Sequence, residues 1–196
     1  MVGAFETAAR DRARRVLFLD VDGVLHPFSA TSFFHAPCMS ALRQIVQQTG
    51  AAIVLSSSWQ GTPAALAQVN AALERNGIPV CIDTTVSNGR AATLPANRAG
   101  EIKSWVEAHA QQCSGGYVVV DDMDLHAFLP PGTFVRTEDE VGLTEADAMR
   151  AIQLLGGPDK SLPPLPPPPR KPGGFNVLVT RGEMQREMMR AAMAGM

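Results

Sequence analysis

Acidic and hydroxyl side chains follow three short apolar runs of this chain. VLFL is followed by Asp20-Val21-Asp22-Gly23, AIVL by Ser56-Ser57-Ser58-Trp59, and YVVV by Asp121-Asp122-Met123-Asp124. Several carboxylates in one crevice repel one another and lose hydration unless a cation lies among them. Mg²⁺ accepts carboxylate and phosphate oxygens as ligands, and a hydroxyl cluster beside it suits a phosphoryl group. These residue types therefore indicate Mg²⁺-dependent phosphoryl chemistry, in which an Asp can act as nucleophile.

Short runs rich in branched residues alternate with amphipathic stretches in the first 155 residues. We expect strands at 16–21, 52–55, 78–82, 117–120 and 134–136, helices at 38–49, 63–76, 98–112 and 144–155, and a loop at 25–37. The alternation predicts a three-layer, Rossmann-like α/β domain, in which helices cover both faces of a mainly parallel sheet. Active groups in such a sheet lie just beyond the carboxyl ends of the strands. The three polar clusters are therefore expected at one edge.

Two helices carry recognisable starting residues. Asn97 is the expected N-cap of the helix at 98–112, and Thr144 is the expected cap of the helix at 144–155. The side-chain oxygens of Asn and Thr accept the backbone N–H groups that a helix leaves unpaired at its start. Arg98 is therefore expected at the N-terminus of its helix.

The composition changes after residue 155. Residues 156–174 hold most of the prolines in the chain, and such a segment forms neither a helix nor a central strand. We expect a catalytic domain at 1–155, a polyproline II linker at 156–174, and a short tail at 175–196 with an amphipathic helix. Pro163 and Pro166 form a PxxP pattern, so a protein partner that binds this segment is the alternative.

Composition and charge exclude several classes of protein. The net charge of −2 gives no overall attraction for nucleic acid or anionic membranes. No apolar run approaches the roughly 18 residues of a membrane span, and we expect no signal peptide at the N-terminus. The cysteines, Cys38, Cys81 and Cys113, lack zinc-site spacing. Scattered cysteines of this kind favour reduced thiols in the cytoplasm.

The three polar clusters also resemble the motifs of a known family. LFLDVDGVLHP resembles the first motif of the haloacid dehalogenase (HAD) superfamily, IVLSSSW its second and VVVDD its acidic fourth. The resemblance covers roughly residues 14–155, and it is narrower for the small HAD domains associated with RNA-repair (Swiss Army Knife) proteins. It implies a HAD-type fold that is capless or has a minimal cap, since neither insertion after Asp22 or Trp59 is long enough for a large cap.

The resemblance implies a phosphohydrolase that works through an aspartyl-phosphate intermediate with Mg²⁺ as cofactor. Asp20 would be the nucleophile and a metal ligand. Asp22 would protonate the leaving oxygen and then activate water, while its backbone carbonyl binds the metal. Asp121 and Asp122 would hold Mg²⁺, directly or through water. Gly23 would permit the tight turn that follows the first strand.

The remaining implied site residues bind the phosphoryl group. Ser56 would donate to it with its hydroxyl, helped by the backbone N–H of Ser57. The superfamily also requires a cation, for which Arg98 is the first candidate and Lys103 the second. The position of Arg98 supports it, because helix N–H groups already favour anions there.

Several alternatives stay open. The substrate is expected to be a phosphorylated small molecule or a terminal phosphate of RNA or DNA. Gln60 stands where subgroup members often carry a basic residue, so a catalytically idle binding or regulatory module that uses the Pro-rich tail is the alternative function. A phosphotransferase would use the same residues. Trp59 and Trp105 are expected to pack in the core, with a stacking role for Trp59 at the rim of the pocket as the alternative. His26 and His35 are expected to be exposed loop residues without a catalytic role, with a contact to substrate as the alternative.

Overall fold

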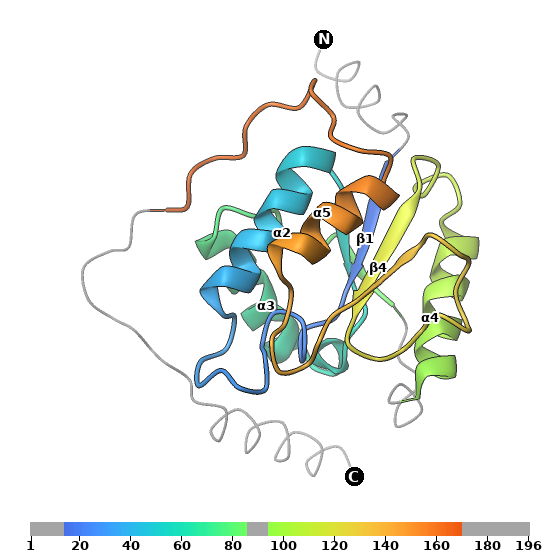
Figure 1. Cartoon of the computed structure of the whole chain (residues 1–196), viewed down its shortest axis with the longest axis horizontal. Coiled ribbons are helices and arrows are strands. Elements are labelled where there is room, and N and C mark those ends of the chain that lie inside the picture. The colour runs from blue at the N-terminus through green and yellow to red at the C-terminus, as the bar shows by residue number, and fades with distance from the viewer. Residues whose placement is uncertain (1–13, 86–93, 170–196) are drawn as a thin grey trace.

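Five parallel strands form the central sheet in the computed structural model, which describes residues 14–85 and 94–169 (Figure 1). The sheet has the strand order β3-β2-β1-β4-β5, and all four pairings are parallel. The strands are β1 (Val16–Leu19), β2 (Ala52–Leu55), β3 (Asp83–Thr84), β4 (Tyr117–Asp121) and β5 (Phe134–Arg136). The predicted α/β fold with a parallel sheet is confirmed.

Helices cover both faces of the sheet. They are α2 (Ala36–Thr49), α3 (Pro63–Arg75), α4 (Pro95–Ala108) and α5 (Glu145–Leu154), with a short 3₁₀ helix, η1, at Ser58–Gly61. Alternate residues of β1 face opposite layers, as the pleat of a strand requires. Helices α2, α3 and α5 lie on one side of the sheet and α4 lies on the other (Figure 1). Leu17 and Leu19 join the core under α2, α3 and α5, whereas Phe18 packs with Trp105 of α4. The helices expected at 38–49, 63–76 and 144–155 are confirmed to within two residues at each end.

The expected strand at 78–82 is wrong. The sheet instead gains the two-residue strand β3, which begins after this run ends. Pro79 has no N–H for a sheet ladder, and Val80 and Ile82 point their side chains toward solvent. The expected first strand is also shortened, because β1 ends at Leu19 and the chain then turns.

The prediction that Asn97 is the N-cap of its helix is wrong as well. Helix α4 begins three residues before the expected start, with Leu94 in the capping position and Pro95 in the first turn. Proline suits this place because its fixed φ matches the helix and its missing N–H is not needed there. In contrast, Thr144 caps α5 as expected, in a reciprocal capping box with Asp147.

The described part of the Pro-rich segment contains neither helix nor strand, as expected, and it packs against α2. We call residues 158–168 the strap. Arg43 of α2 donates from Nη2 to the carbonyl oxygens of Leu165, at 3.2 Å, and Pro166, at 2.7 Å. The Gln47 side chain bonds the backbone N–H of Leu165. The expected tail at 175–196 lies outside the described residues.

Within residues 14–85 and 94–169, no helix combines the length and the apolarity that crossing a membrane requires.

Candidate active site

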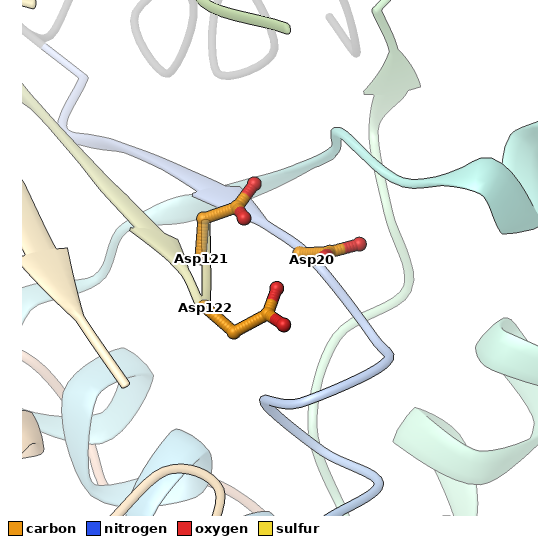
Figure 2. A group of neighbouring side chains, drawn as sticks. All are labelled: Asp20, Asp121 and Asp122. Carbon is orange, nitrogen blue, oxygen red and sulfur yellow. The ribbon is translucent and has the colours of Figure 1, made fainter. Parts of the chain in front are cut away.

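Asp20, Asp121 and Asp122 come together at the carboxyl ends of β1 and β4 (Figure 2). One carboxylate oxygen of each residue lies within 4.8 Å of the others. The two strands are parallel neighbours in which Leu19 lies opposite Val120, so the residues that follow them reach the same edge. The convergence that the sequence predicts is therefore present in the structure.

Burial favours the protonated, uncharged form of these three carboxyl groups. It raises the pKa of Asp20 to about 6, against the opposing effect of Arg98. Burial, together with repulsion by Asp20, raises the pKa of Asp121 well above its usual value. The half-buried Asp122 also has a raised pKa, mainly because of burial. A cluster of hard oxygen donors with too little positive charge fits a divalent cation such as Mg²⁺.

Arg98 supplies the positive side chain of this cluster. Its Nη1 donates to Asp121 Oδ2 at 2.8 Å and lies 3.3 Å from Asp20 Oδ1. The same nitrogen donates to the backbone carbonyl oxygen of Ser56. Burial alone would lower the pKa of Arg98, but the neighbouring carboxylates outweigh it and the pKa is raised. Lys103, the second candidate, lies further along α4 with an exposed side chain, so the structure brings Arg98 and not Lys103 into the cluster.

Two serines at the carboxyl end of β2 complete the site. The backbone N–H of Ser56 donates to the carbonyl oxygen of Leu19 at 2.9 Å, which fixes Ser56 beside Asp20. The hydroxyl of Ser57 hydrogen-bonds the Asp20 carboxylate. The Ser56 hydroxyl is buried and has no hydrogen-bond partner among the described residues. A buried unpaired hydroxyl is costly, and an oxygen of a bound phosphoryl group would satisfy it.

Gly23 lets the turn after β1 pass close to Asp122. Its φ of 68° lies in the left-handed region. A Cβ atom at this position would lie 2.6 Å from Cγ of Asp122. A larger residue would therefore strain the turn and displace a carboxylate of the cluster.

Asp22 lies in the same turn and has two aromatic ring nitrogens beside it. Trp59 Nε1 donates to Asp22 Oδ2 at 3.0 Å, and His26 Nδ1 lies 3.3 Å from Asp22 Oδ1. The sequence interpretation missed both contacts. His26 is buried rather than exposed, and Trp59 packs in the core as expected while also reaching the site. The available signal was that a buried indole N–H needs an acceptor.

The family model described as "HAD domain in Swiss Army Knife RNA repair proteins" matches residues 16–148, which is more than half of the chain. No curated protein matches the chain, and no solved structure does. The match spans all three motifs and confirms the resemblance drawn from them.

Proposed function

We propose that this chain, which belongs to the family of HAD domains in Swiss Army Knife RNA repair proteins, is a Mg²⁺-dependent phosphomonoesterase that works through an aspartyl-phosphate. The observation that carries this proposal is the cluster around Asp20. An acidic nucleophile, two further carboxylates and a buried guanidinium lie next to a hydroxyl without a partner. These groups match the charges of a phosphoryl group and its metal ion.

In the first step, a carboxylate oxygen of Asp20 attacks phosphorus. The bond from phosphorus to the leaving oxygen breaks, and Asp22 gives that oxygen a proton. Arg98 neutralises charge on the phosphoryl oxygens, and the Ser56 hydroxyl and the Ser57 N–H donate to them. The product of this step is a phosphoryl group covalently bound to Asp20.

In the second step, Asp22 takes a proton from water, and the water oxygen attacks the phosphorus of the aspartyl-phosphate. The bond between phosphorus and the Asp20 oxygen breaks, so inorganic phosphate leaves and the Asp20 carboxylate is restored. The residues that would hold Mg²⁺ are Asp20, Asp121 and Asp122, with the backbone carbonyl of Asp22. When bound there, the ion supplies positive charge that offsets the carboxylates and polarises the phosphoryl group.

The proposed substrates are phosphate monoesters, either of small molecules or at the ends of RNA or DNA. Two observations support the nucleic-acid end. The description of the matching family refers to RNA repair, and the residues between β1 and α2 form a loop of turns rather than a cap. We place the protein in the cytoplasm because Cys38, Cys81 and Cys113 are free thiols.

The proposed protein partner of the Pro-rich segment would have to compete with α2. The carbonyl oxygens of Pro163 and Pro166 accept hydrogen bonds from Gln47 and Arg43. Binding of the PxxP pattern by another protein therefore requires part of the strap to leave its place on the domain.

The substitution Asp20→Asn tests the enzymatic proposal. With p-nitrophenyl phosphate and Mg²⁺, it should lower the rate by on the order of 10³-fold or more, because an amide is not a nucleophile. Asp124→Asn is the matched control, since Asp124 is exposed and bonds His126 instead of the cluster. Equal rates for wild type and Asp20→Asn would refute the proposal. Transfer of phosphate to an added alcohol, in place of phosphate release, would identify a phosphotransferase.

A further inference from the structure

The carboxylate of Asp22, the acid and base of the proposed reaction, lies between two aromatic rings. Its side chain is 41% exposed, so packing alone does not fix its rotamer. Trp59 Nε1 donates to one oxygen and His26 Nδ1 faces the other. We propose that Trp59, with help from His26, is a positioning residue that holds Asp22 toward the leaving-group oxygen. This inference rests on the proposed function.

The indole of Trp59 is itself held rigidly. Its side chain is almost fully buried, and Phe33 and Phe34 pack edge-on against it with ring centroids 5.4 and 5.6 Å away. Such edge-to-face pairs add to the stability of a buried ring. The backbone N–H of Trp59 donates to the Ser57 hydroxyl oxygen at 3.4 Å. The loop at 25–35 and the start of η1 therefore fix the direction of a single strong donor.

Among the described residues, the imidazole ring of His26 has a hydrogen-bond partner only at Nδ1. His26 is buried and packs against Phe33 with ring centroids 4.3 Å apart. Its Nε2 atom is buried and has no hydrogen-bond partner within the described residues. A proton on Nε2 would be left unpaired, so the neutral ring carries its proton on Nδ1, which faces Asp22. Both carboxylate oxygens of Asp22 thus have a donor. Each oxygen also keeps a lone pair that can hold the single proton that Asp22 transfers.

This arrangement predicts that the loss of rate on misplacing Asp22 depends on the leaving group of the substrate. An alcohol leaves as a strongly basic oxygen and needs a proton from Asp22, whereas p-nitrophenolate leaves readily without one. Misplacement of Asp22 should therefore slow hydrolysis of alkyl phosphates more than hydrolysis of aryl phosphates. A loss of general structure would slow both reactions alike. The site is accordingly suited to phosphate esters of alcohols, such as those of sugar hydroxyl groups.

Trp59→Phe tests the role of the indole N–H, because phenylalanine keeps a ring in the same place. We expect kcat/KM to fall about tenfold with glycerol 2-phosphate and at most about twofold with p-nitrophenyl phosphate. This parameter reports the steps up to departure of the leaving group. Trp105→Phe is the matched control. Trp105 Nε1 also donates to a carboxylate, Asp83 Oδ2 at 2.8 Å, but outside the acidic cluster, so both rates should stay unchanged.

His26→Phe provides a second variant that should fold. It keeps the contact with Phe33, removes the donor to Asp22, and leaves no unpaired ring nitrogen behind. The same preference for loss with the alkyl phosphate is expected, at about threefold or more. Equal losses with the two substrates in both variants would overturn the positioning role while leaving the phosphatase proposal intact. A wild-type protein inert toward both substrates would overturn the phosphatase proposal itself.

A spectroscopic measurement tests the contact without relying on turnover. The indole N–H resonance of Trp59, assigned by its absence in Trp59→Phe, should shift in Asp22→Ala and stay in place in Asp83→Ala. The resonance of Trp105 should behave in the opposite way. A Trp59 resonance that keeps its chemical shift in Asp22→Ala would overturn the inference, whether or not the protein is active.

Discussion

Two arginines mark two regions of this protein that are built in opposite ways. Arg98 lies among carboxylates whose pKa values are raised by burial, and the Ser56 hydroxyl beside it has no described partner. Arg43 lies between α2 and the strap, and its acceptors are neutral backbone carbonyls. They belong to Asn76, Gly77, Leu165 and Pro166.

The polar groups around Arg98 oppose folding, whereas the hydrogen bonds of Arg43 with the strap favour it. Buried like charges and an unpaired hydroxyl oppose folding, so their presence at one sheet edge points to a bound ligand that offsets them. Hydrogen bonds from the half-buried Arg43 to carbonyl oxygens stabilise the folded state without bringing like charges together. The same substitution in the two regions should therefore have different consequences.

The largest effect on stability is expected for Arg98→Gln. Removal of this guanidinium leaves Asp20 and Asp121 buried without their cation, which should lower the free energy of unfolding by about 3–5 kcal/mol. Urea denaturation of the metal-free protein at pH 7 measures this loss. Turnover of p-nitrophenyl phosphate should also fall by on the order of 10²-fold, because the phosphoryl oxygens lose a neutralising charge. Full activity in this variant would contradict the assignment of Arg98.

A smaller effect is expected from pH. The pKa of Asp20 rises from 3.8 to about 6 on folding, so the folded protein binds this proton more tightly than the unfolded chain. The contribution of Asp20 to stability is thus greatest below pH 4, falls between pH 4 and pH 6, and stays low above that range. The size of the loss is on the order of 2–3 kcal/mol in the metal-free protein. Denaturation of wild type and Asp20→Asn across this range isolates the contribution.

Mg²⁺ provides the control for that pH effect. A divalent ion held by the ionised carboxylates should restore stability above pH 6, by about 2.7 kcal/mol at a concentration 100 times its dissociation constant. Asp20→Asn should show a weaker response. Identical pH profiles for wild type and Asp20→Asn would mean that Asp20 is not the group that titrates.

The smallest effect is expected for Arg43→Gln, the matching substitution in the strap region. Loss of its bonds to the strap carbonyls should lower the free energy of unfolding by about 1–2 kcal/mol, with phosphatase activity within about twofold of wild type. Arg75→Gln is the control on the exposed end of α3 and should change stability by less than about 0.5 kcal/mol. A large loss of activity in Arg43→Gln would show that the strap supports the site and would remove the contrast between the regions.

The carboxylate cluster was predictable from the sequence, and two nearby elements were not. Apolar runs followed by Asp20, Ser56 and Asp121 predict convergence because parallel strands end at the same edge of their sheet. The expected strand at 78–82 contains Pro79 and does not form, and α4 begins at Pro95, before its expected start. A periodic pattern does not show how a proline changes the end of an element.

The sequence by itself determined the α/β fold, the family and the residues that carry the proposed chemistry, since these follow from local patterns of apolar and acidic residues. Tertiary structure alone decided which cation enters the cluster, which rings hold Asp22, and where the strap lies. The contact between Trp59 and Asp22 spans 37 positions, and that between Arg43 and Pro166 spans 123. Such contacts depend on the path of the folded backbone and on side-chain rotamers, and neither leaves a pattern in the order of the residues.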